Sequence, residues 1–256
     1  MGPAPVAQRE AIPVSAAVDA RVAPPSSLLP QSPQQIAPFV LAEADARAAA
    51  LIWLESRWVA PGTFARQARR NTPSASFVPC WIFATHAVAH WEGPGVRGII
   101  EMDFVDLAMS ADPAADALPD SLAPWPSQAL RPFDPQYEGN RPHGRATRDV
   151  GDAATLAHQR MERDLLATAR RSQPAKQRDK LRLLGVEYPR ETSVLALLPV
   201  WFVDCIYLGQ THRIAINGVT GRVGGSVPVS IEKIVAAAAA LAALCVAVAW
   251  HAVADA

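Results

Sequence analysis

The strongest pattern along the chain is an uninterrupted apolar run near its C-terminus. Residues 234 to 250 carry no charged side chain, and with residues 251 to 254 the run continues to about 20 residues. At about 1.5 Å of rise per residue, such a helix nearly spans a hydrocarbon layer of about 30 Å. The run predicts a transmembrane helix whose larger apolar side chains are Ile234, Leu241, Leu244, Val248 and Trp250.

The residues that flank this run predict its orientation. Lys233 precedes it and Trp250 lies near its end, as basic flanks and interfacial aromatic rings predict. Basic residues on its N-terminal side would keep the folded part in the cytoplasm. We therefore expect a single-pass, tail-anchored protein of the bacterial inner membrane. The alternative is a buried alanine-rich helix, but an all-round apolar helix at the end of a chain has no later segment to cover it.

Upstream of this run, helical and β periodicities each occur twice. Residues 41 to 58 predict a helix with Ala44, Ala48, Leu51, Leu54 and Trp58 on one face. Residues 77 to 91 and 96 to 107 predict strands joined by a turn at 93–95. Residues 151 to 172 predict a second helix, and 194 to 207 and 212 to 216 predict two more strands. Asn217-Gly218 suits the positive dihedral angles of a tight turn.

The two β regions share a motif. Residues 77–83 and 197–203 both read apolar, apolar, Pro, any residue, Trp, apolar, apolar, with Pro79 and Trp81 in one copy and Pro199 and Trp201 in the other. The copies lie 120 positions apart. The repeat predicts an α+β fold of two related halves, each a helix packed on a small antiparallel sheet, followed by one transmembrane helix. The alternative is coincidence, since aromatic strand starts after proline are common.

Proline distribution and the repeat together predict the domain boundaries. Residues 1–35 are rich in Pro, Ala, Ser and Gln and predict a disordered tether. Residues 36–145 and 146–228 would form the two halves, with the membrane anchor over 229–256. Pro79 inside a strand predicts that the strand starts there or lies at a sheet edge.

Composition excludes several classes of function. The 24 basic and 24 acidic residues give no net charge, which excludes a globally basic nucleic-acid binder. Cys80, Cys205 and Cys245 are far apart, so neither a disulfide framework nor a structural zinc site is expected. His86 and His90 fall in a predicted strand, where four residues span roughly 13 Å, too far to share a metal. Phosphate-binding loops and nucleophile elbows are also missing from the sequence, and we expect no enzyme, catalytic residue, metal or cofactor.

One basic segment could contact anionic groups. It contains Arg170, Arg171, Lys176, Arg178, Lys180 and Arg182, opposed only by Asp179. Beside a membrane, such a segment would meet anionic lipid headgroups. Nucleic acid is not expected there, because exposed aromatic residues do not interleave with the charges. The plain alternative is a solvated helix end.

Several motifs in order resemble a known family. They are Ile36-Ala37-Pro38-Phe39, Trp53-Leu54-x-x-Arg57-Trp58-x-Ala60-Pro61, Val78-Pro79-x-Trp81-Ile82-Phe83, Leu130-Arg131-Pro132-Phe133-Asp134-Pro135-x-Tyr137, Leu197-Leu198-Pro199-Val200-Trp201 and Ala215-x-Asn217-Gly218-x-Thr220-Gly221-x-Val223. Much of 33–247 thus resembles bacterial membrane proteins that begin with a TFIIB-type zinc ribbon and are often labelled primosomal or replication-factor-like. This chain has no Cys or His before residue 33, so zinc binding does not carry over.

The resemblance implies a non-enzymatic role near membrane-stress scaffolds, with no catalytic residues. From it and from the apolar run we expect a membrane-anchored scaffold or accessory subunit that presents a cytoplasmic α+β domain. Its partners would be membrane lipid and an unidentified membrane or membrane-associated protein complex. The alternative function is an anionic-lipid or nucleic-acid binding module that uses residues 170–182.

Overall fold

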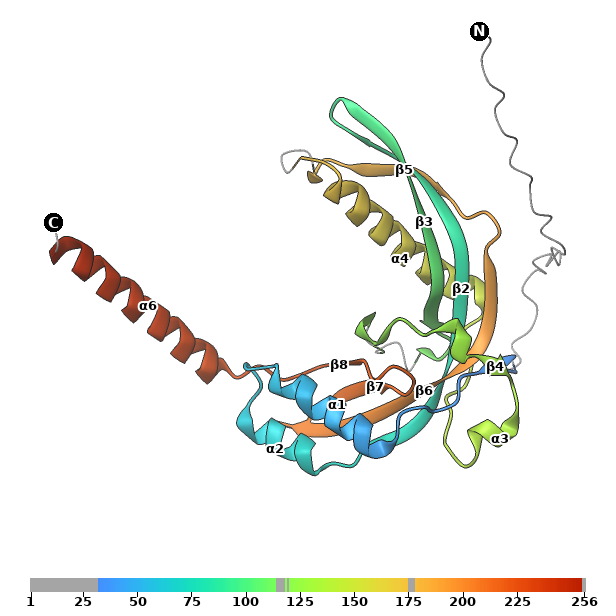
Figure 1. Cartoon of the computed structure of the whole chain (residues 1–256), viewed down its shortest axis with the longest axis horizontal. Coiled ribbons are helices and arrows are strands. Elements are labelled where there is room, and N and C mark those ends of the chain that lie inside the picture. The colour runs from blue at the N-terminus through green and yellow to red at the C-terminus, as the bar shows by residue number, and fades with distance from the viewer. Residues whose placement is uncertain (1–31, 114–117, 119, 175–177, 255–256) are drawn as a thin grey trace, which may run out of the picture.

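A strongly curved sheet of eight strands forms the body of the protein (Figure 1). The computed structural model describes residues 32–113, 118, 120–174 and 178–254. Two long strands, β2 (Ser74–Gly93) and β6 (Thr192–Tyr207), pair antiparallel at the centre of the sheet. The tether predicted over residues 1–35 lies almost wholly outside the described residues.

The remaining strands extend this central pair. β3 (Val96–Ser110) and β5 (Arg182–Glu187) pair with β2, while β7 (Gln210–Asn217) pairs with β6 and with β8 (Val223–Gly225). Two short strands, β1 (Gln35–Ile36) and β4 (Arg131–Pro132), continue the sheet beside β6. β1 runs parallel to β6 and the other pairings are antiparallel, so the sheet is mixed.

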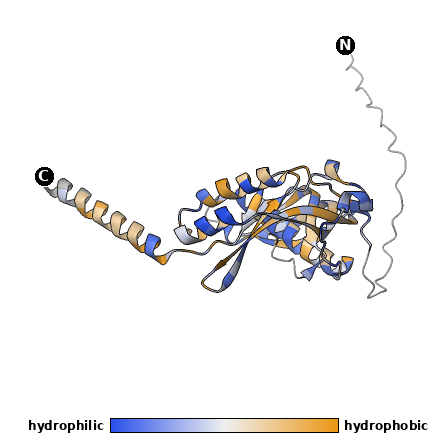
Figure 2. Cartoon of the chain, turned by 90° about the horizontal axis from the view of Figure 1, so that it is seen from below, coloured by the Kyte–Doolittle hydropathy of each residue, from blue (hydrophilic) through white to orange (hydrophobic). Residues whose placement is uncertain are grey.

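Helices lie on one face of this sheet, and one further helix leaves the body. α1 (Glu43–Glu55) and α2 (Gly62–Arg70) pack on β6 and β7, and α4 (Val150–Arg171) packs on β2 and β3. α3 (Pro135–Glu138) and the 3-10 turns Asp120–Leu122 and Ser127–Ala129 belong to the connection between β3 and α4. α6 (Ile231–Ala254) projects from the body (Figures 1 and 2).

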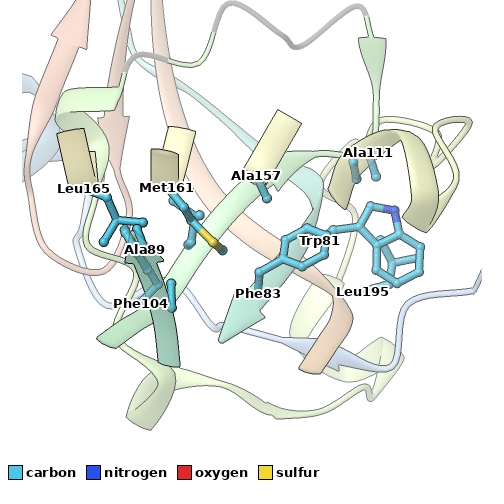
Figure 3. Packing of buried hydrophobic residues seen from close by; sticks show 12 residues of the cluster. Trp81, Phe83, Ala89, Phe104, Ala111, Ala157, Met161, Leu165 and Leu195 are labelled. Atoms are coloured by element: carbon cyan, nitrogen blue, oxygen red, sulfur yellow. The ribbon is translucent and has the colours of Figure 1, made fainter. Parts of the chain in front are cut away.

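Strand alternation sorts the core between the two faces of the sheet. Trp81, Phe83 and Leu195 face α4, and Met161 and Leu165 of α4 are fully buried against this group (Figure 3). Trp201 and Val203 face α1 and α2 in the same way. The intervening residues of the strands, such as Cys80 and Leu198, face the opposite side, where Leu122 and Trp125 cover them. Successive strand side chains point to opposite faces, so both layers are built from the same two strands.

Each main helix covers the hairpin that it does not precede. α1 precedes the β2–β3 hairpin in the chain but packs with α2 on β6 and β7. α4 precedes the β6–β7 hairpin but packs on β2 and β3. The chain therefore crosses over twice, and neither hairpin has its covering helix from its own half.

The two copies of the proline–tryptophan motif lie side by side in the β2–β6 pair. Val78 and Leu198, which occupy equivalent motif positions, face each other directly. The carbonyl of Pro79 accepts a hydrogen bond from Ala111 N, just after β3 ends, and that of Pro199 accepts one from Gly218 N, just after β7 ends. On a strand, the missing proline N–H points the same way as the carbonyl. Neither proline therefore interrupts the bonds between β2 and β6.

This arrangement corrects the expectation for Pro79. The proline lies in the middle of a strand and at the centre of the sheet, not at a strand start or a sheet edge. It is tolerated because its N–H would point past the end of β3, where no strand needs the donor.

The two motif tryptophans make matching hydrogen bonds. Trp81 Nε1 donates to the carbonyl of Arg148 at 3.1 Å, two residues before α4 begins. Trp201 Nε1 donates to the carbonyl of Leu41, also at 3.1 Å and two residues before α1 begins. Each indole thus fixes the start of the helix that covers it, and a buried indole N–H has the partner that it requires.

Asn217 joins the β7–β8 turn to the segment on the far face. Its side chain is fully buried, and its Nδ2 donates to the carbonyls of Leu122 (2.9 Å) and Pro124 (3.4 Å). Its Oδ1 accepts from the backbone N–H groups of Val219 and Thr220. The Arg222 guanidinium also donates to the carbonyl of Ala123. The segment 120–125 is therefore held by the turn.

The positive dihedral angles expected at Asn217-Gly218 are absent. Neither residue has a positive φ. Glycine is required there for space, because a Cβ on Gly218 would lie 2.8 Å from the Phe39 ring and 2.9 Å from Pro199 Cβ.

The buried face of α1 also differs from the expected one. Ala46, Ala50 and Leu54 are buried, whereas Ala48 and Trp58 are exposed, and Trp58 lies beyond the helix. Alanines occur all around this helix, so the sequence offers little contrast between its faces.

The predicted fold class, two halves with their own sheets followed by a transmembrane helix, is wrong. The eight strands form one mixed sheet that runs through both predicted halves. The pairing of β2 with β6 joins the two halves that the local periodicity of the sequence had indicated as separate sheets.

The transmembrane, tail-anchored and inner-membrane predictions are also corrected. Within the described part of the chain, no helix combines the length and the apolarity that a membrane crossing requires.

Replacing Asn217 tests whether it holds the far-face segment. Asn217→Ala should lower the free energy of unfolding by about 2–3 kcal/mol, because buried carbonyls and N–H groups lose their partners. Asn140→Ala, at an exposed turn position, is the control and should change it by less than about 0.5 kcal/mol. Urea denaturation followed by circular dichroism measures both. Equal stability of the two variants would contradict the role given to Asn217.

The tryptophan pair predicts matched losses of stability. Trp81→Phe and Trp201→Phe should each lower the unfolding free energy by about 1–2 kcal/mol, because each leaves one carbonyl unpaired and a small void. Trp58→Phe, at a position 60% exposed, should have an effect under about 0.5 kcal/mol. The same urea titration compares all three. An unchanged unfolding free energy in either Trp81→Phe or Trp201→Phe would show that the indole at that position does not hold the start of its helix.

Candidate functional site

The first turn of α6 is tied to the loop between α1 and α2. The backbone N–H of Ser230 donates to the Val59 carbonyl at 2.8 Å. The Lys233 ammonium donates to the carbonyls of Trp58 (3.0 Å) and Ala60 (2.6 Å). A single lysine thus satisfies two loop carbonyls and fixes the point from which α6 leaves the body.

Beyond that turn, α6 exposes apolar side chains along its length. Ile234 is 45% exposed, and the larger residues after it are more so: Val235, Leu241, Leu244, Val246 and Trp250, the last at 76%. Figure 2 shows the apolar helix standing clear of the body after a hydrophilic first turn. At 3.6 residues per turn these positions are distributed around the helix and do not form one stripe. The side chain of Val248 lies outside the described residues.

The base of α6 adds further exposed apolar groups. Trp58, Val229 and Ile231 are all more than half exposed, and they flank the residues that bond α6 to the loop. Exposed large apolar groups are common singly, but a contiguous set of this kind marks an interaction site. We call Trp58, Val229, Ile231 and the apolar side chains of α6 the α6 surface.

The predicted basic segment is partly neutralised by contacts. Arg182 forms an ion pair with Glu92, which Arg97 also approaches at 3.6 Å. Arg178 Nε donates to the Gln173 carbonyl and Arg171 donates to Thr168 Oγ1. The ion pair of Arg182 neutralises one charge, whereas the bonds of Arg178 and Arg171 to neutral oxygens leave those two charges in place.

The other members of the segment differ in their surroundings. Lys180 is exposed, while Arg170 is half-buried and its Nε has no hydrogen-bond partner among the described residues. Lys176 lies outside the described residues. The described members of the segment therefore lie in different surroundings, and their contact with anionic headgroups stays a prediction.

A cleft that the sequence did not indicate lies along the outer edge of β3. Its volume is about 640 Å³, and α4, the end of β3, Leu118 and the segment 120–125 enclose it. An ion pair between Arg160 and Asp120, 2.6 Å long, bridges α4 to that segment. The local pattern could not reveal this site, because its walls come from three segments that only the tertiary fold brings together.

Three described histidines have acidic partners: His143, whose Nε2 lies 3.0 Å from a Glu138 oxygen, and two that join neighbouring elements of the fold. His158 stacks on Tyr188, with ring centroids 3.9 Å apart, and its Nε2 lies 2.5 Å from a Glu191 oxygen. Burial and the nearby Glu162 carboxylate raise the pKa of Tyr188. His86 lies on β2, where a hydrogen bond to Asp103 across the hairpin raises its pKa. Both groups join neighbouring elements, and the His158 group ties α4 to the β5–β6 connection.

The cysteines fall into two environments. Cys80 and Cys205 are buried, and burial raises the pKa of the Cys80 thiol to about 12. Cys245 is exposed on α6. Among the residues that the structure describes, no group of three or more His, Cys, Asp or Glu side chains is placed to hold a metal ion.

Comparison with known proteins gives one distant relative and no family. The chain is similar to YdjG, an uncharacterized protein of Bacillus subtilis (strain 168), with 21% identity over 226 residues. The matched region covers 80% of this chain and 66% of that protein, so the chain spans about two thirds of the relative's length. No family model and no solved structure matches the chain.

Proposed function

We propose that this chain is a non-enzymatic interaction protein that docks on a partner protein through α6. The observation that carries the proposal is the exposure of apolar side chains all around α6, together with the bonds that fix its base. Water solvates such a helix poorly, so burial of its surface would be strongly favourable, at about 25 cal/mol per Å². The resemblance to a zinc-ribbon membrane-protein family stays a separate prediction.

The distribution of apolar groups selects the kind of partner. Ile234, Leu241 and Leu244 lie on one side of α6, and Val235, Val246 and Trp250 lie on the roughly opposite side. A groove that covers one face would leave the others in water. A partner that supplies several apolar helices around α6 would cover them all. We therefore expect α6 to complete a helical bundle in the partner.

A second copy of the chain fits this surface less well. Two α6 helices packed together bury only their facing sides, and in any symmetric cluster of α6 helices the outward sides stay exposed. The many alanines of α6 allow close helix approach, which suits insertion among the helices of another protein. The fixed base would then present the sheet and its three covering helices in a defined direction.

Charge substitution on α6 tests the docking role. The double variant Leu241→Glu, Leu244→Glu should abolish retention of the partner, because two buried charges without counterions would have to enter an apolar bundle. Leu208→Glu, on the β6–β7 turn and 86% exposed, is the matched control and should retain it. The wild type, the double variant and the control are compared by affinity purification of the full chain from its native cells, with quantification of the proteins that co-purify in stoichiometric amounts.

The reactivity of Cys245 shows whether a co-purified protein actually covers α6. In the free protein its exposed thiol should react readily with iodoacetamide, and in the complex the reaction should slow by about tenfold or more. The buried Cys80 and Cys205 should react slowly in both states. Full reactivity of Cys245 in the complex would contradict the proposal. Assembly of the purified chain alone, by light scattering, or flotation of the chain with phosphatidylcholine vesicles free of protein, would also overturn it.

A further inference from the structure

We infer that the cleft beside β3 binds a small organic anion with an apolar body. The inference is independent of α6 and rests on the lining of the cleft. Its volume of about 640 Å³ lies within the range of small-molecule sites in proteins.

The floor of the cleft is apolar. Met109 of β3, Leu122 and Trp125 of the far-face segment, and Leu156 of α4 contribute to it. Cys80 also lines the cleft, and its raised pKa keeps the thiol neutral at physiological pH. Such a surface favours an aliphatic or aromatic group and disfavours a fully hydrated ion.

The rim of the cleft is positively charged. Arg148, Arg160 and Arg163 line it, and Asp120 is the acidic residue among the lining residues. Asp120 pairs with Arg160, and Arg148 donates to the Ser110 carbonyl at 2.6 Å. Arg163 is exposed, one helical turn from Arg160 on α4, and can turn its guanidinium to an incoming anion. Guanidinium groups bind carboxylate and phosphate oxygens through paired hydrogen bonds.

The walls of the cleft are held in place before any ligand arrives. Asn217 anchors the carbonyls of Leu122 and Pro124, and the Arg160–Asp120 pair fastens α4 to the same segment. On the other side, Met161 and Leu165 fix α4 to the sheet. A preformed site loses little conformational entropy on binding, so a small ligand can be held there.

Octanoate is the probe that tests both features of the cleft. Isothermal titration of the full chain should give saturable binding with a dissociation constant below about 1 mM. Octanol, which has the tail without the charge, and acetate, which has the charge without the tail, should each bind at least about fivefold more weakly. Equal binding of octanoate and octanol would overturn the charged rim, and equal binding of octanoate and acetate would overturn the apolar floor.

Two variants locate the binding in this cleft. Arg163→Gln should weaken octanoate binding about three- to fivefold, whereas Arg66→Gln, an exposed helical arginine on α2, should leave it unchanged. Leu156→Trp, at a position 39% exposed at the mouth, should fill the cleft and abolish binding without unfolding the chain. Circular dichroism and thermal denaturation verify that each variant is folded. Wild-type affinity in both Arg163→Gln and folded Leu156→Trp would place the binding elsewhere and overturn the inference.

Discussion

The pairing of β2 with β6 is the constraint on which the rest of the structure depends. Every other strand attaches to this pair directly or through one neighbour, and both faces of the core are built from its alternating side chains. The pairing admits two prolines at its centre because each points its missing donor past the end of a neighbouring strand. It also places the two tryptophans on one face, where each holds the start of a helix.

Because of this pairing, each main helix packs on the hairpin from the other half of the chain, and we expect the two halves to fold together. Because α1 covers β6 and β7 while α4 covers β2 and β3, neither half of the chain can bury its own hairpin alone. The segment 120–125, which follows β3, covers the opposite face of the sheet, and Asn217 fastens it to the β7–β8 turn. The same fastening forms one wall of the cleft beside β3, so the proposed ligand site depends on contacts far apart in the sequence.

The α6 surface is a different kind of feature, because the body does not cover it. Lys233 donates two hydrogen bonds, to the loop carbonyls of Trp58 and Ala60, and these bonds fix the direction of the helix. A helix held at its base and apolar all around is suited to enter another body rather than to lie on its own. The two proposed activities therefore use separate parts of the molecule: α6 for a protein partner, and the β3 edge for a small anion.

Features that depend on residues near each other in the chain could be predicted from the sequence. Alternation and turn residues located β2 with β3 and β6 with β7, and apolar spacing located the helix α4, in which Met161, Leu165 and Ala169 are buried. Three features could be seen only in the folded chain: the register of β2 against β6, the choice of helix that covers each hairpin, and the cleft with its three walls. An apolar stripe shows that a surface will be buried, but it does not specify which surface will cover it. The same holds for α6. Its apolar run is plain in the sequence, but whether its own chain covers it depends on packing, and the structure leaves it exposed.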